Sequence, residues 1–486
     1  MSGLSDLIRT AGNALLSPVA LGDLPGARAW RRALLVGSGD RALLEQAQAD
    51  LRRAAPDVSV EDACGSGLWV LRRRGYDVAC LLLTGEGRRR EKALGAFSGA
   101  RVVLAYGPGR GWYRLHLPAF RPSSGRWWAR ALLAKLLCIG YTFVMLAIAA
   151  TDALRRAIPM PRPVSDPGPP VGRETTFIVP TYNQRHLMDF CLPALVREAG
   201  QRHAVLVVDD ASTDGTYEYV RRRYPGVTAV RLPANRGFAG AVRAGIAASR
   251  TPLFALINTD VQIRPGFLEA ILPHFREADT FAVCCRIELP GGSQMETGNA
   301  AGDFSGILEP HFVPPTGPGP ILYATGACSV FHRARYEALG GLETIYRPLY
   351  WEDTELGYRA WRRGWRSVFE PRASALHRRR MWIGARFGNA YADETFLRNA
   401  ILFVWKNVRD PGLLARHLVY TWAVLARETD GESRMMTRAV IRALPLLPAV
   451  LLRRWREWRR GDLGDREILA LSRPPAAGDP AEAVRA

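Results

Sequence analysis

Short apolar runs alternate with longer polar stretches in the first quarter of the chain. The runs have the length and the Val and Leu content of buried strands, and they cover residues 33–37, 58–60, 78–83 and 102–105. Most of the intervals between them can hold a helix, so the pattern predicts a small α/β domain over residues 31–120, preceded by an N-terminal segment of residues 1–30. Gly-Ser-Gly-Asp at 37–40 favours an ordinary strand-to-helix turn over a dinucleotide site, because the third glycine of that motif is absent.

The most hydrophobic stretch of the chain, residues 136–150, lies inside a longer helical pattern at 126–157. A membrane span needs about 20 apolar residues, and that length is reached here only by including Lys135 or Asp152. Anchor residues typical of a membrane interface flank the stretch: Arg126, Trp127, Trp128 and Arg130 before it, Arg155 and Arg156 after it. Since both flanks are basic, the pattern favours a helix that lies along or dips into one leaflet, with a buried core helix as the alternative.

A proline-rich linker, residues 158–172, leads to a second α/β pattern, which we place at residues 173–400. Its apolar runs are again short and bounded, as in a parallel sheet, and they cover residues 177–179, 205–208, 228–232 and 253–257. The pattern therefore predicts a second, larger α/β domain.

The last part of the chain is helical, amphipathic and basic over residues 401–472. The apolar residues 444–452 directly precede a stretch rich in Trp and Arg at 453–460, which indicates a second contact with a membrane surface. Packing against the preceding domain is the alternative. Residues 473–486, rich in Pro and Ala, are predicted to be a disordered tail.

Charge and cysteine usage exclude some classes of function. The chain carries 66 Lys and Arg against 46 Asp and Glu, a net charge of +20 that favours an anionic surface as partner. Only Lys92, Lys135 and Lys406 are lysines, so the excess reflects an arginine-rich composition, and without an aromatic-basic recognition motif we expect no nucleic-acid partner. The seven cysteines form no Cys-x-x-Cys pair and no secretory signal is visible, which favours the reducing cytoplasm.

Polar segments follow the apolar runs of the second domain, at the strand ends where an open parallel sheet binds its ligands. They are Pro-Thr-Tyr-Asn at 180–183, Asp-Asp at 209–210, Asn-Arg-Gly-Phe-Ala-Gly at 235–240 and Asn-Thr-Asp at 258–260. A fifth segment, Trp-Glu-Asp-Thr-Glu at 351–355, opens a predicted helix. Two adjacent acids directly after a strand are hard to explain as helix caps alone, so we expect them to bind a ligand.

This ordered set of segments resembles the inverting nucleotide-sugar glycosyltransferases of family 2, which have the GT-A fold, over about residues 175–406. The resemblance implies an α/β catalytic domain of GT-A type, to which this chain adds the small N-terminal α/β domain, the apolar membrane-associated helix and the helical C-terminal region. It also implies a donor site for a nucleoside-diphosphate sugar. The residues expected there are Pro180, Tyr182, Asn183, Asp209, Asp210, Asn235, Gly237 and Asn258.

A divalent cation, Mg²⁺ or Mn²⁺, is the cofactor that the resemblance implies. Asn-Thr-Asp at 258–260 resembles the Asp-x-Asp motif of the family with Asn in first place, so Asp260 is the expected ligand of the cation that neutralises the leaving diphosphate. His377 resembles the late histidine of the family and is the second expected ligand. The arginines at 378–380 offer an alternative way to bind the diphosphate directly.

The pair Glu352 and Asp353 resembles the acceptor-side acids of the family, in which the aspartate is the catalytic base. An inverting transfer needs one carboxylate to take the proton of the acceptor hydroxyl as its oxygen attacks the anomeric carbon. The resemblance further implies an acceptor pocket that includes Gly326, Ala327 and Trp351.

Together these residues imply a metal-dependent, inverting transfer of a sugar to a glycan or lipid-linked acceptor, in bacterial cell-surface polysaccharide or glycolipid synthesis, at the cytoplasmic face of the inner membrane. The same fold acting on a soluble or protein acceptor is one alternative, and a non-catalytic nucleotide-sugar-binding or scaffold protein is another. The expected function requires Asp210, Asp260 and Asp353 to converge in one cleft.

Overall fold

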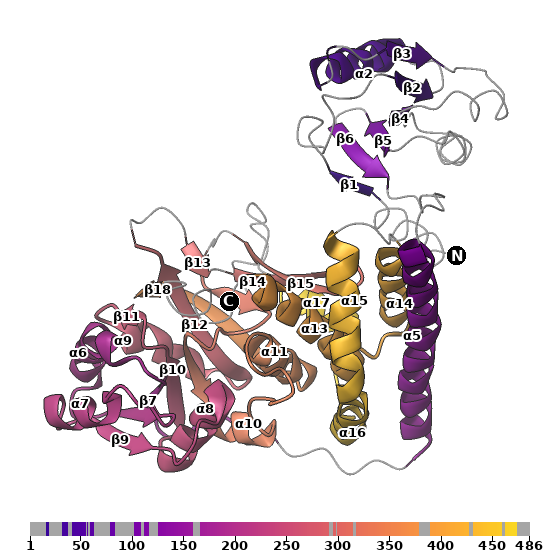
Figure 1. Cartoon of the computed structure of the whole chain (residues 1–486). Coiled ribbons are helices and arrows are strands. Elements are labelled where there is room, and N and C mark those ends of the chain that lie inside the picture. The colour runs from indigo at the N-terminus through magenta and orange to yellow at the C-terminus, as the bar shows by residue number, and fades with distance from the viewer. Residues whose placement is uncertain are drawn as a thin grey trace. The chain divides into compact units, whose positions relative to one another are not determined.

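The computed structural model describes residues 16–18, 32–36, 41–54, 56, 59–62, 78–82, 102–107, 111–115, 125–158, 166–290, 295–297, 299–313, 317–378, 389–426, 431–458 and 462–473 (Figure 1). The chain divides into two compact units, one of Met1–Phe143 with Ala415–Thr437 and one of Val144–Leu414 with Arg438–Ala486. The turn at 37–40, residues 159–165 of the proline-rich linker and the predicted disordered tail after Arg473 lie outside the described residues.

The first unit contains a sheet whose strand order is β1-β6-β5-β4-β2-β3. Its strands are β1 (Leu16–Pro18), β2 (Arg32–Val36), β3 (Ser59–Asp62), β4 (Val78–Leu82), β5 (Val102–Gly107) and β6 (Gly111–Leu115), with helix α2 at Arg41–Ala54. The four strands predicted from the apolar runs, β2 to β5, pair in parallel, whereas β6 and β1 add to them in antiparallel fashion. The N-terminal part is therefore an α/β layer, as its pattern predicts.

Helix α5 (Gly125–Ala157) covers the predicted apolar stretch as one continuous helix. Among the described residues, six of its large apolar side chains are more than half exposed: Leu132, Leu136, Ile139, Phe143, Leu146 and Leu154. Within the first unit it contacts α14 (Pro411–Leu425), where Trp422 donates from its indole nitrogen to the carbonyl of Cys138 at 3.0 Å. Exposure of this extent argues against the alternative of a buried core helix.

The second unit is built on a sheet with the strand order β11-β18-β12-β17-β10-β7-β8-β9. Its strands are β7 (Thr175–Thr181), β8 (Ala204–Asp209), β9 (Thr228–Arg231), β10 (Leu253–Ile257), β11 (Val261–Ile263), β12 (Thr280–Glu288), β17 (Cys328–His332) and β18 (Arg366–His377), with β13 (Met295–Thr297) and β16 (Gly319–Ile321) at its margin. β14 (Asn299–Phe304) and β15 (Leu308–Val313) form a separate antiparallel pair. The four strands predicted for this domain are β7 to β10, and they are parallel to one another.

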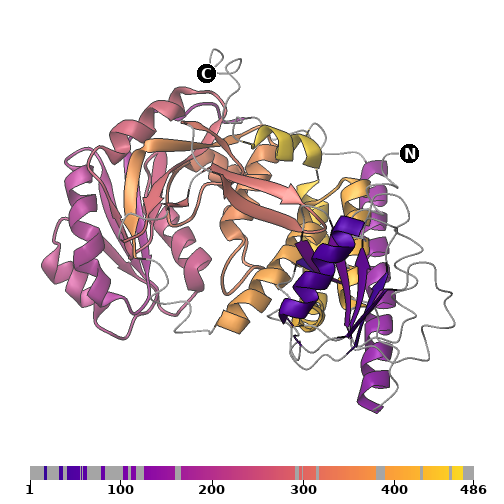
Figure 2. The same cartoon turned by 90° about the horizontal axis from the view of Figure 1, so that it is seen from above.

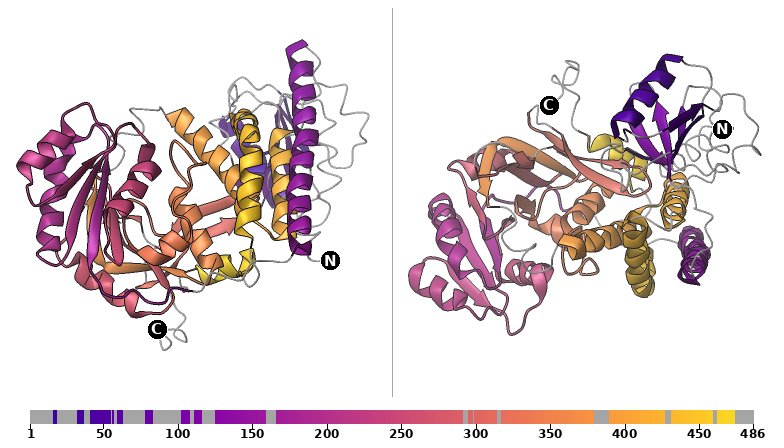
Figure 3. Two further views of the ribbon diagram at one scale, coloured as in Figure 1. Left: turned by 90° about the horizontal axis from the view of Figure 1, so that it is seen from below. Right: turned by 45° about the horizontal axis from the view of Figure 1, so that its top comes forward.

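Alternate side chains of the buried strands point to opposite faces of this sheet. Phe177 and Val179 pack with α6 (Met188–Ala199), α7 (Thr216–Arg223) and α9 (Phe267–Ile271), while Ile178 packs with the helices of the other face. Those helices are α8 (Gly237–Ala248), α10 (Arg333–Ala338) and α11 (Glu352–Arg362). Figure 1 shows α6, α7 and α9 on one side of the sheet and α8 on the other, and Figure 2 and the left panel of Figure 3 show the same layers from two further directions.

The strand order reverses between β7 and β10. From β7 the chain moves outward through β8 to β9, and α8 then returns it to β10 on the opposite side of β7. In open α/β sheets, ligands bind in the crevice outside the carboxyl ends of the strands at such a reversal point. The topology therefore places the candidate site at the ends of β7, β8 and β10.

The C-terminal helices pack on the second unit through buried polar contacts. They include α13 (Asn389–Asn407), α15 (Gly431–Ala443), α16 (Leu447–Glu457) and α17 (Asp465–Leu471). Lys406 is fully buried and donates from Nζ to Glu355 at 2.5 Å and to Glu457 at 2.6 Å, and Arg454 donates from Nε to Asp152 of α5 at 2.6 Å. Buried charges persist in a fold when they are paired in this way, so these contacts connect α11, α13, α16 and the end of α5.

Two helical stretches among the described residues are long and apolar enough to cross a membrane. They are Leu132–Ala157 and Ser433–Glu457. In the most apolar part of each stretch, 22% and 28% of the residues, respectively, are buried. The second combines α15, a short 3₁₀ turn (Leu444–Leu446) and α16, and it matches the apolar stretch before the Trp- and Arg-rich segment. Both predicted membrane contacts are thus helical, and most residues of their most apolar parts are not buried.

Candidate functional site

A cleft of about 420 Å³ opens at the carboxyl ends of β7, β8 and β10, where the strand order reverses. This volume lies within the range of ~300–1,000 Å³ that is usual for ligand pockets. Most of the site residues predicted from the sequence line the cleft. They are Pro180, Tyr182, Asp210, Asn235, Gly237, Asn258, Asp260, Gly326, Ala327, Glu352 and Asp353. The three acids required to converge, Asp210, Asp260 and Asp353, are all among them.

Two residues expected in the donor site, Asp209 and Asn183, are not part of the cleft lining. Asp209 is fully buried, where Oδ1 accepts a hydrogen bond from the backbone N–H of Ser212 and Oδ2 lies 3.4 Å from Arg231. Burial raises the pKa of Asp209. Asn183 has a positive φ of 54°, and its Oδ1 accepts from the backbone N–H of Thr213 at 2.7 Å. Both side chains hold the loops after β7 and β8 in place rather than facing the cavity.

Trp351, expected in the acceptor pocket, also lies outside the cleft lining. Its side chain is buried and its ring packs 5.3 Å from that of Phe396 and 5.1 Å from that of Phe403, centroid to centroid. The residue before it, Tyr350, lines the cleft in its stead. Trp351 therefore anchors the start of α11 against α13 through these ring contacts.

Asp210 fixes the loop that opens α8. Its two carboxylate oxygens accept hydrogen bonds from the backbone N–H groups of Arg236 and Gly237 at 2.7 and 2.8 Å. These N–H groups belong to the positive end of α8, where a carboxylate is electrostatically favourable. The side-chain amide of Asn235 donates to the carbonyl of Asp210 at 3.4 Å. Asp210 therefore joins the ends of β8 and α8 on the wall of the cleft.

Asp260 and His377 come together from separate parts of the sequence. β11 pairs with β18, and this pairing sets His377 beside Val261, so that Nε2 of His377 lies 3.1 Å from Oδ1 of Asp260. Asp260 lines the cleft, whereas His377 contacts it from outside the lining. Among the described residues no group of three or more His, Cys, Asp or Glu side chains is arranged to hold a metal ion.

A two-ligand arrangement of this kind fits a cation that is completed by its substrate. Mg²⁺ in particular is usually bound through one or two carboxylates together with substrate phosphates and water, and carboxylate ligands also suit Mn²⁺. Arg378 stacks on Phe190, with its guanidinium carbon 4.0 Å from the ring centroid, and its backbone N–H donates to the carbonyl of Asp260 at 2.9 Å. The rest of the predicted arginine run lies outside the described residues.

Glu352 and Asp353 occupy the first turn of α11 and face the cleft. Asp353 accepts hydrogen bonds from two backbone N–H groups, that of Thr354 at 2.8 Å to Oδ1 and that of Gly326 at 3.2 Å to Oδ2. Both bonds favour the ionised carboxylate, although burial raises the pKa of Asp353. Since each oxygen keeps a further lone pair, Asp353 can accept a proton from a group bound in the cleft.

The neighbouring carboxyl behaves differently. Burial and the charge of Asp353 raise the pKa of Glu352 to about 8. Two carboxyl groups this close titrate as a pair, in which the better hydrogen-bonded member ionises first. At neutral pH the pair therefore carries one negative charge, held by Asp353, and Glu352 is protonated.

The segment before α11 is held by a residue that the sequence analysis missed. The side-chain amide of the buried Asn399 on α13 donates to the carbonyls of Tyr346, Leu349 and Tyr350 at 2.7, 2.9 and 3.0 Å. Leu349 and Tyr350 line the cleft. Nothing in the sequence near Asn399 marks it, because its partners are carbonyl groups about fifty residues earlier in the chain.

Other missed residues belong to the cleft lining itself. Thr259 donates from Oγ1 to the side-chain oxygen of Gln184 at 2.6 Å, and this pair joins the ends of β7 and β10. The ring of Phe238 lies close to Gly326, where an added Cβ would come within 3.5 Å of it. Thr259 and Phe238 lie inside the segments 258–260 and 235–240 that the sequence analysis identified. Their positions next to predicted site residues could therefore have indicated that they line the cleft.

Strained backbone gathers around the same cleft. Among the described residues, the non-glycine residues with positive φ are Asn183, Ala211, Tyr350 and Trp351. All four lie in the loops that follow β7 and β8 or precede α11. Such conformations are costly and persist where the surrounding structure enforces them, most often at functional sites.

The central part of the chain matches the model of a known protein family. Residues 176–340 match the model of Glycosyl transferase family 2. This range includes the segments at the ends of β7, β8 and β10, whereas Glu352 and Asp353 follow it. The resemblance inferred from the ordered segments is confirmed over this part of the chain.

Two relatives from Mycobacterium tuberculosis are similar to the chain. The N-acetylglucosaminyl-diphospho-decaprenol L-rhamnosyltransferase is 28% identical over 228 residues, which are 40% of this chain and 73% of the relative. The pre-mycofactocin glycosyltransferase is 28% identical over 266 residues, which are 52% of this chain and 53% of the relative. A solved structure, that of GalNAc-T7 with UDP, GalNAc and Mn²⁺, has a TM-score of 0.41 and 14% identity over 49% of this chain and 48% of its own.

Proposed function

Because the chain is a glycosyltransferase with a family 2 domain over residues 176–340, we propose that it transfers a sugar, with inversion, from a nucleoside diphosphate to a hydroxyl of a lipid-linked glycan. The observation that carries the proposal is the convergence of Asp210, Asp260 and Asp353 on one cleft at the reversal point of the sheet. Each acid comes from a different strand end or helix start, so only the fold brings them together. A non-catalytic binding protein would not need the third of them.

The donor occupies the side of the cleft formed by β7 and β8. The loop around Tyr182 and the Asp210 anchor receive the nucleoside, and the diphosphate extends toward Asp260 and His377 at the end of β10. These two residues would hold a divalent cation, which supplies positive charge for the departing diphosphate. Asp260 and His377 orient each other through their 3.1 Å contact, so the carboxylate keeps its position when the diphosphate arrives.

The acceptor hydroxyl approaches from the side of Asp353. Asp353 takes the hydroxyl proton while the acceptor oxygen forms a bond to the anomeric carbon, and the bond from that carbon to the diphosphate oxygen breaks on the opposite face. The electron pair of the broken bond leaves on the nucleoside diphosphate. The N–H groups of Gly326 and Thr354 keep the Asp353 carboxylate aimed into the cleft throughout.

A lipid-linked acceptor is supported by two observations. One relative, which this chain matches over 73% of its length, is named for transfer to a sugar linked to diphospho-decaprenol. The chain also has two helices that are long and apolar enough to enter a bilayer. We place the enzyme at the cytoplasmic face of the inner membrane, where nucleotide sugars and such acceptors meet, in the synthesis of a bacterial cell-surface polysaccharide or glycolipid. The exposed Arg156 at the end of α5 favours anionic headgroups.

A donor panel tests the proposed activity. Thermal unfolding is followed with UDP-, dTDP- and GDP-sugars, each with and without Mn²⁺, and one donor is expected to raise the unfolding temperature more with the cation than without it. Equal stabilisation by the sugars of all three nucleotides, or stabilisation by none of them, would contradict the proposal.

Membrane association is tested on the exposed face of α5. Changing Leu136, Ile139 and Phe143 to Gln should move the protein from the membrane to the soluble fraction, while the donor-dependent thermal shift stays the same. Gln at the exposed, polar position Lys135 of the same helix is the control. An unchanged distribution of the triple variant would rule out this face as the lipid contact.

A further inference from the structure

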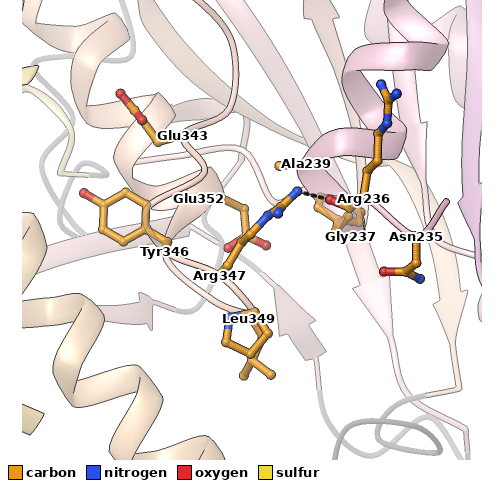
Figure 4. A pocket seen from close by; sticks show the side chains of 11 residues that line it. Asn235, Arg236, Gly237, Ala239, Glu343, Tyr346, Arg347, Leu349 and Glu352 are labelled. Carbon is orange, nitrogen blue, oxygen red and sulfur yellow. Dashed lines mark hydrogen bonds between the residues drawn. The ribbon is translucent and has the colours of Figure 1, made fainter. Parts of the chain in front are cut away.

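A second, smaller pocket of about 180 Å³ adjoins the cleft (Figure 4). The two cavities share six lining residues: Asn235, Gly237, Phe238, Pro348, Leu349 and Glu352. A group bound in the smaller pocket is therefore connected directly with the cleft and with the first turn of α11. Its volume is below the ~300 Å³ typical of a pocket for a whole small ligand, so it suits one part of a larger ligand.

Arg347 extends its guanidinium into this pocket. Figure 4 shows the group reaching toward the loop before α8, where Nη2 donates to the carbonyl of Arg236. Gly237 and Gly240 lie beside it, and an added Cβ at these positions would be in ordinary van der Waals contact with it, 3.9 Å from Nε and 3.6 Å from Nη2, respectively. The side chain of Arg236 points away from Arg347 in the same view.

The positive charge of Arg347 is not neutralised by the pocket. Among the described residues, no carboxylate lies within 4.0 Å of its guanidinium nitrogens. Glu343, on the pocket wall, is paired with Lys406 at 3.5 Å and with Arg453 at 2.9 Å. Glu352, the other acid of the wall, is protonated at neutral pH because its pKa is raised to about 8. The pocket therefore presents a net positive charge beside the catalytic acid pair.

We propose that this pocket, the Arg347 pocket, binds a phosphate group of the acceptor and that Arg347 recognises it. The inference rests on the proposed function and adds to it that the acceptor is linked to its lipid through phosphate. A guanidinium matches phosphate oxygens with paired N–H donors, which gives both affinity and orientation. The diphosphate of the donor belongs elsewhere, because Asp260 and His377 do not line this pocket. A phosphate held here sets the attached sugar at the mouth of the cleft, next to Asp353.

Two acceptors that differ only in the linkage test the inference. One is N-acetylglucosamine joined through a diphosphate to a short polyprenyl chain, and the other is the octyl glycoside of the same sugar. For Arg347→Gln we expect the KM of the diphosphate acceptor to rise at least about tenfold, as for loss of a charge-assisted contact. The KM of the octyl glycoside should change less than about twofold, and Arg347→Lys should fall between the wild type and Arg347→Gln for the first acceptor.

Two controls separate this inference from the proposed function. The donor affinity of Arg347→Gln, measured by calorimetry, should equal that of the wild type, and Arg222→Gln, which removes an exposed arginine of α7 outside both cavities, should leave both KM values unchanged. Weaker donor binding by Arg347→Gln, or an equal rise of KM for both acceptors, would overturn the role of Arg347. A wild-type enzyme that uses only the octyl glycoside would overturn the phosphate inference and leave the glycosyl transfer standing, whereas transfer to neither acceptor would overturn both.

Discussion

Asp353→Asn is the change that isolates proton removal from every other role of the cleft. Asparagine has nearly the same size, and its remaining oxygen can still accept from either Thr354 or Gly326. Its amide cannot take a proton from the acceptor hydroxyl at neutral pH. Loss of a general base slows turnover by about 10²–10⁴-fold, which at 1.36 kcal/mol per factor of ten is ~3–5 kcal/mol of barrier. We expect a fall of at least about 300-fold, within that range.

The structure also sets the expected cost to stability. In the wild type, the backbone N–H groups of Thr354 and Gly326 donate to the Asp353 carboxylate at 2.8 and 3.2 Å. In the asparagine variant, one of these two N–H groups faces the side-chain NH₂ group, which cannot accept its hydrogen bond. Leaving such a donor unpaired costs about 1–3 kcal/mol, which we expect as a lower unfolding free energy of the variant.

The assay compares turnover with donor binding in the same preparation. Initial rates are measured with saturating donor and acceptor, and the donor Kd by calorimetry with Mn²⁺ present. The Kd should remain within about twofold of the wild type, because Asp353 receives the acceptor and not the nucleoside. Asp393→Asn, on the exposed surface of α13, is the matched control. Normal turnover by Asp353→Asn would refute the assignment of the base, and a parallel loss of donor affinity would place Asp353 in the donor site.

Three further changes probe the cleft. Glu352→Gln should remove a step near pH 8 from the pH–rate profile and leave the acid limb set by Asp353. Because the folded protein holds the Glu352 proton up to about pH 8, against a usual pKa of 4.5, the wild type loses stability as the pH rises through this window and the variant should not; equal pH dependence in urea unfolding would contradict the raised pKa. Asp260→Ala should weaken donor binding about tenfold or more with Mn²⁺ and little without it, and equal weakening would remove Asp260 from the cation site. Asn399→Ala, which deletes three hydrogen bonds to the 346–350 segment, should lower kcat and cost ~2–4 kcal/mol of unfolding free energy at unchanged donor Kd; a variant with full kcat would show that the segment needs no such support.

The fold followed from the sequence where a local pattern determines the structure. Bounded apolar runs predict β2 to β5 and β7 to β10. For β10 the reason is clear, because a strand buried on both faces needs apolar side chains throughout. The helix start at Glu352 is predicted by two acids at its first turn, which the helix dipole favours. The later strands β12, β17 and β18, which complete the sheet in antiparallel and parallel pairings, depend on contacts between distant segments.

The site followed less completely, for a related reason. A motif marks which residues stand at a strand end, but which of two neighbouring side chains faces the cavity depends on the direction in which the backbone presents each of them. Asp210 rather than Asp209, and Tyr350 rather than Trp351, line the cleft. Asn399 and Arg347 act through backbone carbonyls of distant segments, for which no side-chain pattern exists in the sequence.

The anomeric configuration of the first product tests the central claim most directly. The donor selected in the thermal panel is incubated with enzyme and acceptor, and the new linkage is assigned by proton NMR before any equilibration. Direct attack by a hydroxyl that Asp353 deprotonates, on the face opposite the diphosphate, predicts a configuration opposite to that of the donor. A product that keeps the configuration of the donor would contradict the account.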